Sequence, residues 1–323
     1  MSSSPIILQP SLTLPERIIG VDTPGFQEKF NHSPFMFSHN LVGHPLFEIP
    51  RLVDLANNLF PKGQIFCCKN GNYPGMKWEQ LPRKKQIVEA ILNIEESDSF
   101  IMFKSAHVDP DYKALLDKTL IELEDLTTVP LHREITWSIA TIIVSSPHSI
   151  TPYHIDHDCN FLFQIHGDKD IHLFDQNDRS VLTEEEIENF YLGHISSANY
   201  REENQNKASV NHLVPGEGIH HPVLAPHWVK NRDNYSVSLS INFCLKTCDL
   251  HARIYQVNYY LRKLGMLPTP PGQSVLRDRT KIFAVEMFSK RKPENHDEVL
   301  HSGIKRITAP AKLFQEAVRS LKR

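Results

Sequence analysis

The sequence predicts a mainly β protein of the α+β class, with an antiparallel β-sandwich or barrel at its centre and helix-containing extensions on both sides. Between residues 131 and 248, short runs rich in Ile, Val, Thr and aromatic residues recur and are separated by turn residues. Before and after this part, apolar residues recur with helical spacing instead. We therefore divide the chain into a mixed α/β region that packs on the core (1–130), the β core itself (131–248) and a C-terminal helical region (249–323).

The N-terminal region shows little periodicity up to residue 45 and then alternates between helical and strand patterns. The first helix has Leu52, Leu55 and Leu59 on one face and ends before Pro61. Pro110 suits the first turn of a later helix, where no hydrogen bond from its nitrogen is needed. We expect helices over 52–60, 80–96 and 109–126, and strands over 64–69 and 99–103.

The central region is expected to hold a series of short strands and one inserted helix. That helix, over 183–191, begins with Thr183 as its N-cap, and Glu186 three residues later completes a capping box. Strands are expected over 135–144, 153–156, 161–166, 170–174, 208–213, 218–224, 228–230 and 237–245, and further helices over 249–265, 278–290 and 309–322.

Composition and charge exclude several classes of protein. The apolar content of 40% and charged content of 23% are ordinary for a globular protein. No apolar run approaches the roughly 20 residues that span a bilayer, and the N-terminus lacks a signal-peptide pattern, so we expect a cytoplasmic protein. The net charge of −3 does not favour binding to nucleic acid. Lys and Arg outnumber Asp and Glu in 251–323, but they are spread out, as on solvated helix faces.

The five cysteines do not suggest a disulfide framework, because their number is odd and Cys67 and Cys68 are adjacent. Cys244 and Cys248 have the spacing of half a zinc site, but no second cysteine pair accompanies them. We expect buried free thiols in a reducing compartment.

Three residues form a candidate metal site. His154 and Asp156 are two residues apart on an expected strand, so their side chains point to the same face. His227 lies just after the strand expected at 218–224 and could supply a third ligand. Two histidines and one carboxylate form the facial triad of non-haem Fe(II) oxygenases. In a chain with 18 histidines the short motif is weak by itself.

The surrounding residues match a longer pattern, T-x-x-H-x-D-x-x-x-N-F-x-x-Q-I-x-G-x-K, without any insertion. A second pattern, P-G-D/E-x4-P-x4-H, ends at His227, and an asparagine follows fifteen residues later. In residue types, order and spacing, the segment 150–245 resembles the JmjC and cupin-like Fe(II)/2-oxoglutarate oxygenases, most closely the factor-inhibiting-HIF asparaginyl hydroxylases. The matching residues are Thr151, His154, Asp156, Asn160, Phe161, Gln164, Ile165, Gly167, Lys169, Pro215, Gly216, Glu217, Pro222, His227 and Asn242.

The resemblance implies a double-stranded β-helix core of the jelly-roll or cupin type, in which His154, Asp156 and His227 hold Fe(II). It also implies that 2-oxoglutarate and O2 are cosubstrates. The chain departs from the family before His227, where Val223 to Ala225 replace aromatic residues, and at His220. The resemblance therefore does not carry over a substrate preference, which we expect to reside in loops such as 68–79 and 192–207 and in the N-terminal segment.

Four further residues would bind the cosubstrate. Lys169 would pair with the distant carboxylate of 2-oxoglutarate, and Thr151 would add a hydroxyl beside it. Asn160 and Asn242 would contact the cosubstrate or the metal ligands. From sequence alone Lys169 could equally be a solvated turn residue, since it stands in a Gly-Asp-Lys-Asp turn.

The activity implied by the resemblance is hydroxylation of a C–H bond, with release of succinate and CO2. The substrate would be a protein or peptide side chain or a small amino-acid-like molecule. An N-demethylase would use the same triad and release formaldehyde, whereas a metal-binding cupin sensor would not turn over. RNA modification finds little support in a pI of about 6.7. In the similar hydroxylases the helices after the core form a homodimer; here they could do so or pack on their own barrel.

Overall fold

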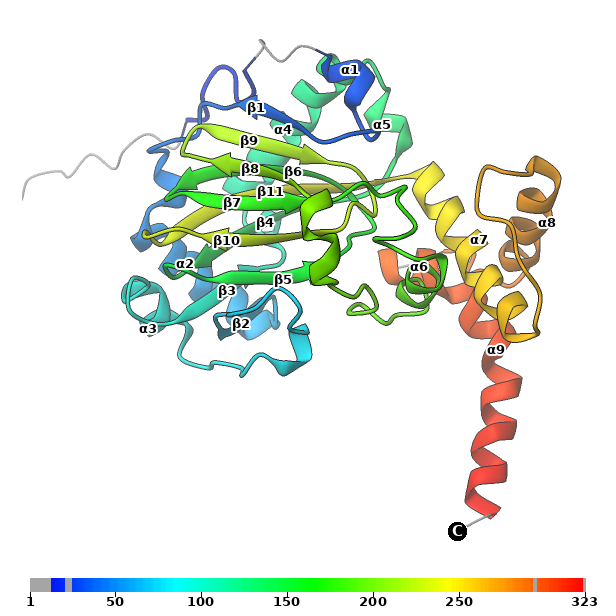
Figure 1. Cartoon of the computed structure of the whole chain (residues 1–323). Helices are drawn as coiled ribbons and strands as arrows, with labels where there is room; N and C mark the ends of the chain where they lie inside the picture. The colour runs from blue at the N-terminus through cyan, green and yellow to red at the C-terminus, as the bar shows by residue number, and fades with distance from the viewer. Residues whose placement is uncertain (1–12, 21–24, 293–294, 322–323) are drawn as a thin grey trace, which may run out of the picture.

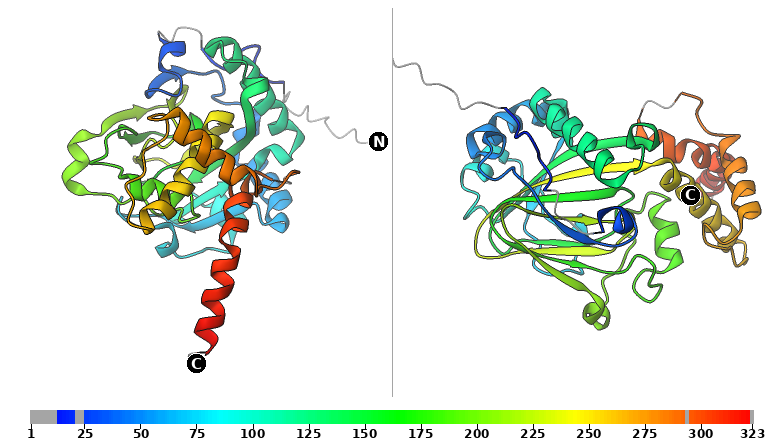
Figure 2. Two further views of the ribbon diagram at one scale, coloured as in Figure 1. Left: turned by 90° about the vertical axis from the view of Figure 1, so that its right-hand side faces the viewer. Right: turned by 90° about the horizontal axis from the view of Figure 1, so that it is seen from above.

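The computed structural model describes residues 13–20, 25–292 and 295–321 of the chain. Two antiparallel β-sheets lie face to face, as the right-hand view of Figure 2 shows. Helices of the N-terminal region cover the outer side of the larger sheet, and the C-terminal helices gather at one end of the strands (Figure 1). The predicted double-stranded β-helix with helical extensions is confirmed. Residues 1–12, on which the expectation about a signal peptide mostly rests, lie outside the described residues.

Within the described residues, seven strands form one sheet in the order β1-β9-β6-β11-β4-β3-β2, and four form the other in the order β5-β10-β7-β8. Because the chain between β5 and β11 passes repeatedly from one sheet to the other, it winds around the space between them. The strands are β1 (Phe35–Ser38), β2 (Ile65–Lys69), β3 (Ser99–Phe103), β4 (Ile135–Ser145), β5 (Ile150–His154), β6 (Cys159–His166), β7 (Lys169–Leu173), β8 (Ser209–Leu213), β9 (Glu217–His221), β10 (His227–Asn231) and β11 (Ser236–Leu245).

The helices flank this core, and several have caps that the sequence explains. Asp109 accepts a hydrogen bond from the backbone N–H of Asp111 at the start of α4. Thr183 and Glu186 form the expected capping box of α6. The α-helices are α1 (Phe26–Lys29), α2 (Ile49–Leu59), α3 (Ile87–Leu92), α4 (Pro110–Thr127), α5 (Leu131–Glu134), α6 (Glu184–Phe190), α7 (Lys246–Lys263), α8 (Val275–Glu286) and α9 (His296–Leu321).

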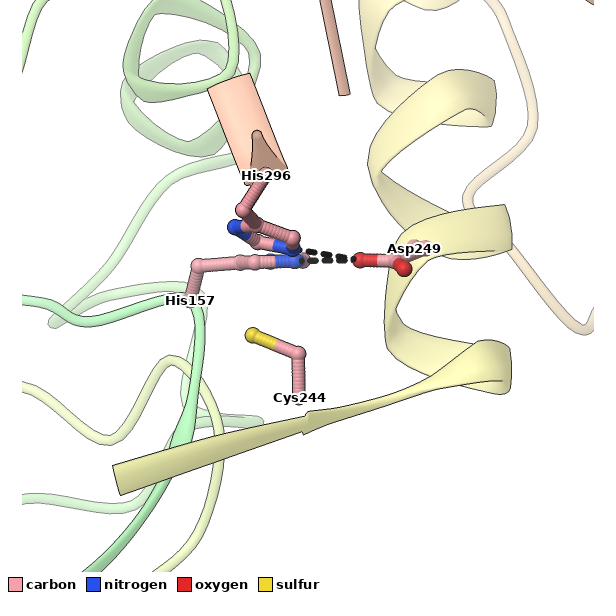
Figure 3. Close-up of side chains that lie close together, drawn as sticks. All are labelled: His157, Cys244, Asp249 and His296. Carbon is pink, nitrogen blue, oxygen red and sulfur yellow. Dashed lines mark hydrogen bonds and ion pairs between the residues drawn. The ribbon is translucent and has the colours of Figure 1, made fainter. Parts of the chain in front are cut away.

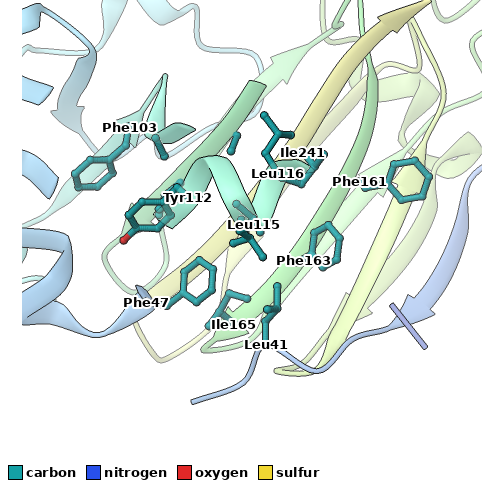
Figure 4. Close-up of a cluster of buried hydrophobic side chains, with 14 of the residues drawn as sticks. Leu41, Phe47, Phe103, Tyr112, Leu115, Leu116, Phe161, Phe163, Ile165 and Ile241 are labelled. Atoms are coloured by element: carbon teal, nitrogen blue, oxygen red, sulfur yellow. The ribbon is translucent and has the colours of Figure 1, made fainter. Parts of the chain in front are cut away.

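The main hydrophobic core lies between the larger sheet and the helices α2 and α4 (Figure 4). In β6, Phe161 and Phe163 point to this side and are fully buried. Leu162, between them, belongs to a second apolar cluster with residues of the smaller sheet. The strand is therefore buried on both faces, which explains why its sequence is almost continuously apolar instead of alternating.

The face of β11 that points between the sheets carries a row of small polar residues. Leu239, Ile241 and Phe243 belong to the helix-covered core, so the residues between them face the other way. We call this set, which continues to the end of the strand, the β11 inner row; it consists of Ser238, Ser240, Asn242 and Cys244. The register pairs Asn242 of this row with Asn160 of β6. A hydrogen-bonding surface is thereby built into the interior of the sandwich.

Several predicted elements differ from those observed. The helix expected over 80–96 is shortened to α3, because Pro82 lies within the segment and the preceding residues form a short 3-10 turn (Trp78–Gln80). The helix expected over 309–322 starts much earlier, at His296, and residue 322 lies outside the described residues. Strand β1 was not expected at all; it pairs with β9, and backbone pairing of this kind leaves no periodic signature in four residues.

The C-terminal helices expose several large apolar side chains, including Leu276 and Phe283 of α8. Such side chains suit contact with a second copy, but the homodimer stays a prediction. Among the described helices, none combines the length and the apolar content that crossing a membrane requires. All five cysteines are free and buried, as expected.

Candidate metal centre

The three candidate metal ligands come together at one end of the smaller sheet. His154 ends β5 and His227 begins β10, and the register pairs these two residues directly. Asp156 follows β5 by two residues, and its backbone carbonyl accepts a hydrogen bond from Leu224 in the turn before β10. Strand pairing therefore brings together ligands that are more than seventy residues apart in sequence.

The ligand atoms converge on one point. The Nε2 atoms of His154 and His227 each lie 3.7 Å from Oδ2 of Asp156, and the two imidazole rings are 4.1 Å apart between centroids. All three ligand atoms lie within 4.8 Å of one another, close enough for one ion to contact all of them. Two imidazole nitrogens and one carboxylate oxygen form a donor set that suits Fe(II) and similar divalent transition metals.

Backbone carbonyl groups orient both histidines in the same way. Nδ1 of His154 donates to the carbonyl oxygen of Pro152 at 2.7 Å, and Nδ1 of His227 donates to that of Ala225 at 3.0 Å. A carbonyl can only accept, so the proton sits on Nδ1 and the Nε2 lone pair faces Asp156. Burial and the neighbouring His154 lower the pKa of His227 well below its ordinary value, which keeps it neutral, as a metal ligand must be.

All seven predicted site residues line one cavity of about 160 Å³ between the two sheets. The cavity has a polar side and an apolar side. The predicted residues on its wall are Thr151, His154, Asp156, Asn160, Lys169, His227 and Asn242, and its apolar wall consists of Trp78, Phe100, Met102, Ile143, Leu162, Ile171 and Val229. The structure thus brings together all seven residues that sequence analysis predicted for the site. Their individual roles remain predictions.

Lys169 is a buried cation without an acidic partner. Its side chain is only 4% exposed, and its Nζ donates to Oγ of Ser238 at 2.7 Å. No carboxylate of the described residues forms an ion pair with it, and burial lowers the pKa of its ammonium group to about 7. The solvated-turn alternative for this residue is therefore wrong. A buried lysine with one neutral hydrogen bond leaves donors available for an anion in the cavity.

A short polar chain connects β6 to β11 on the cavity wall. Nδ2 of Asn160 donates to Oγ of Ser240 at 2.7 Å, and that hydroxyl donates to Oδ1 of Asn242 at 2.6 Å. The remaining side-chain oxygen of Asn160 is buried and has no hydrogen-bond partner in the described residues. An unsatisfied polar atom in a cavity wall is expected where a bound molecule completes the hydrogen bonding.

Sequence analysis missed several residues of the site. Ser238 and Ser240 look like ordinary strand residues, and only the register of β11 shows that they contact Lys169 and Asn160. Asp158 follows Asp156 by two residues but is not among the residues that line the cavity; burial and the charge of Asp156 raise the pKa of its carboxyl group to about 8. No sequence signal marks any of these three residues.

Trp78 and His221 are two further missed residues of the cavity wall. The Trp78 ring meets that of His154 edge to face at 5.8 Å, and His221 lies 4.4 Å from the His227 ring. Trp78 lies in the loop 68–79, one of the segments in which substrate specificity is expected to reside. The neighbouring Lys77 donates to the backbone carbonyl groups of Ser196 and Ala198, so this loop contacts the loop 192–207.

Other histidines have structural partners instead. Both ring nitrogens of His220 have partners: Nδ1 donates to the carbonyl oxygen of Asn160, and Nε2 accepts from the backbone N–H of Asn31. It also stacks on Phe161 at 4.4 Å, which explains why it can replace an apolar residue. His172 stacks on Trp228 at 3.7 Å on the outer face of the smaller sheet.

The fold and the ligand geometry define a double-stranded β-helix protein with a candidate metal centre of two histidines and one aspartate. The profile of the cupin-like domain family matches residues 79–246, more than half of the chain. The chain therefore belongs to the cupin-like domain family. A comparison with curated protein sequences found no significant match.

Comparison with solved structures found matches at low sequence identity. The X-ray structure of Escherichia coli YcfD has 16% identity and a TM-score of 0.50, over 86% of this chain and 70% of that one. The structure of YcfD described as a ribosomal oxygenase in complex with cobalt and 2-oxoglutarate has 16% identity and a TM-score of 0.49, over 86% and 69%. At this identity the likeness concerns the fold alone.

Proposed function

We propose that this protein is an Fe(II)- and 2-oxoglutarate-dependent oxygenase. It would hydroxylate a C–H bond of a protein or peptide side chain, or of a small amino-acid-like molecule, and release succinate and CO2. The observation that carries the proposal is the combination, in one cavity, of the His154, Asp156 and His227 triad with the unpaired buried Lys169. A metal site alone would need no buried cation, and a buried cation is costly unless an anion joins it.

The residues present fit both groups. The triad would hold Fe(II) through two Nε2 atoms and one carboxylate oxygen, and its three ligands leave positions open for other molecules. Lys169, positioned by its bond to the Ser238 hydroxyl, would bind the distant carboxylate of 2-oxoglutarate, beside Thr151. When bound, iron with 2-oxoglutarate and O2 supplies the oxidation of an unactivated C–H bond, which no amino-acid side chain can perform.

The chain itself orients the reactants and excludes water. The carbonyl groups of Pro152 and Ala225 fix the two imidazole rings, so the ligand atoms need little rearrangement on binding. The apolar wall of the cavity limits access of water to the reacting atoms. Asn160 is fixed by the bond from Nδ2 to Ser240 and has a second Nδ2 proton that could be donated to the bound cosubstrate.

The fold of E. coli YcfD agrees with this proposal but does not indicate which substrate this protein acts on. YcfD is described as a ribosomal oxygenase and has been solved with 2-oxoglutarate, but identity is only 16%. The support therefore comes from the residues of this chain, and ribosomal proteins are one substrate class among those to be screened.

The experiment that tests the proposal is reconstitution of the purified chain with Fe(II) and 2-oxoglutarate without oxygen, followed by exposure to air. Succinate formed in the absence of substrate would establish cosubstrate turnover. Candidate peptides and small molecules are then added and analysed by mass spectrometry. Gain of one oxygen identifies hydroxylation, whereas loss of one methylene with formaldehyde identifies demethylation. Binding of metal without any succinate would contradict the proposal and favour a sensor.

The affinity for 2-oxoglutarate should decrease above neutral pH. A bound carboxylate favours the charged form of Lys169, so binding raises the pKa of its ammonium group from about 7 in the free protein. The contribution of charged Lys169 to binding of 2-oxoglutarate is thus fully present below pH 7 and is lost as the pH rises above it. We expect the Kd to rise about tenfold per pH unit between pH 7 and 9, since one proton is linked to binding.

Isothermal titration calorimetry with Mn(II) in place of iron measures this Kd without turnover. Running it in two buffers of different ionisation enthalpy counts the protons taken up. Lys169→Arg stays charged throughout this range and should lose the pH dependence, whatever its affinity. A wild-type Kd that is constant from pH 7 to 9 would exclude Lys169 as the partner of the carboxylate.

A further inference from the structure

A second group of metal-ligating side chains lies outside the cavity. His157 stands in the turn between β5 and β6, and Cys244 stands near the end of β11. Asp249 lies in the first turn of α7, and His296 begins α9. Figure 3 shows the four side chains converging from these separate elements. We call these four residues the junction cluster, because they join the β core to the C-terminal helices.

The geometry of the junction cluster is compact. The Nε2 atoms of His157 and His296 lie 2.9 Å and 3.2 Å from the same oxygen, Oδ1 of Asp249. One ligand atom from each of the four residues, including Sγ of Cys244, lies within 4.8 Å of the others. A tetrahedral zinc ion with bonds of about 2.0–2.3 Å holds its ligand atoms about 3.3–3.8 Å apart. Side-chain movements of roughly 1 Å would therefore close the four ligands around one ion.

The hydrogen bonding of the cluster is incomplete without an ion. Asp249 is 4% exposed, and its Oδ2 atom is buried without any hydrogen-bond partner among the described residues. A buried carboxylate normally satisfies both oxygens, so the unused one indicates a missing partner. The charges also point to a divalent cation: a thiolate at Cys244 and the Asp249 carboxylate together would neutralise it, leaving a buried site without net charge.

Outer contacts hold the two imidazole rings in place. Nδ1 of His157 lies 3.0 Å from the hydroxyl of Tyr191, so its Nε2 can face the cluster while Nδ1–H donates outward. The ring of His296 stacks on Trp137 of β4 at 5.0 Å and on His157 at 5.3 Å between ring centroids. The outward hydrogen bond of His157 is of the kind that metal-bound histidines usually have, whereas His296 is held by ring stacking.

We propose that the junction cluster is a structural zinc site that fastens α7 and α9 to the β core. Four protein ligands of the types His, Cys, Asp and His would fill the tetrahedral coordination of zinc and leave no open position. Cys244 is fully buried, so the same residues do not form a nucleophilic Cys–His–Asp site, which would need access for a substrate. The site shares no residue with the triad and does not depend on the oxygenase proposal.

The test measures zinc in a background that removes the other centre. The full chain carrying His154→Ala and His227→Ala is incubated with excess zinc, passed over a desalting column and analysed by mass spectrometry for bound metal. We expect about one zinc per chain, because four ligands bind structural zinc tightly. Adding Cys244→Ser or Asp249→Asn should reduce this to near zero. Adding Cys248→Ala, which removes the neighbouring buried thiol, should leave it unchanged.

A spectroscopic measurement on the chain that keeps all four ligands gives a result that does not depend on whether the Cys244 and Asp249 variants fold. Cobalt(II) loaded into the His154→Ala, His227→Ala chain should give the near-ultraviolet charge-transfer band of a cobalt–thiolate bond. Chelation of zinc should also lower the Tm of that chain. Absence of both zinc and the cobalt–thiolate band would overturn the proposal. So would zinc that persists in the Cys244→Ser chain or disappears in the Cys248→Ala chain.

Discussion

Replacing His154 by alanine should abolish metal binding at the triad and reduce 2-oxoglutarate-dependent succinate formation by more than about 100-fold, because loss of even a supporting outer contact of a metal ligand costs 10–100-fold. Its Nε2 is one of the three candidate ligand atoms that the described residues bring together here, so the remaining pair would not retain the ion. The measurement is succinate release under saturating Fe(II) and 2-oxoglutarate. Asp156→Ala should behave in the same way.

The control for this prediction is His172→Ala, which removes a half-buried histidine from the smaller sheet. His172 stacks on Trp228 and contacts Gln205, outside the cavity. We expect its succinate formation to stay within about twofold of the wild type, since surface contacts of this kind contribute little. Undiminished turnover in the His154→Ala chain would rule out the triad as the catalytic metal site.

Replacing Lys169 by methionine should have two effects of opposite sign. The affinity for 2-oxoglutarate should fall by about 100-fold or more, because removing one partner of a buried charge pair costs 2–5 kcal/mol. The free protein should become more stable by on the order of 2 kcal/mol at pH 7, since a buried ammonium with a lowered pKa is replaced by an apolar side chain of similar length. Metal binding at the triad should not change.

The pH dependence separates these effects. In the folded state the pKa of Lys169 is about 7, below its unfolded value, so the unfolded chain binds the extra proton between these two values. The stability advantage of Lys169→Met should therefore be largest at pH 7 and below and should shrink toward pH 10. Urea unfolding at pH 7 and pH 9 measures it, with Ser238→Ala as the control that keeps the cation. A methionine variant that binds 2-oxoglutarate normally would show that this lysine has another role.

Sequence could predict those features of the site that depend on residues close together on one strand. His154 and Asp156 share a face because they are two residues apart, and the spacing of the family pattern indicated His227 as the third ligand. The direct pairing of His154 with His227 is known only from the structure. The burial of Lys169 could not be predicted, because its turn has the composition of an exposed loop. Lys169 is buried because β7 pairs with β10 in the smaller sheet, which faces the larger one. This pairing joins segments that are distant in sequence, so local sequence does not reveal it.

The fold was predictable where periodicity is strong and not where it is weak. The strands of the core and the helices α2 and α4 follow clear apolar patterns. Strand β1 is too short for a pattern, and its pairing with β9 depends on a segment distant in sequence. The junction cluster could not be predicted either, because no spacing motif relates its four residues, His157, Cys244, Asp249 and His296. In addition, we expected Cys244 to be a free thiol and therefore did not consider it as a metal ligand.

The β11 inner row connects the two candidate sites through a single strand. Ser238 contacts Lys169, Ser240 and Asn242 line the cavity, and Cys244 belongs to the junction cluster. A slip of one residue in the pairing of β11 would turn this whole row outward and bring Leu239, Ile241 and Phe243 inward. A single shift in the register of β11 would thus disrupt both sites. Correct register of this strand is therefore a shared requirement of the two candidate sites.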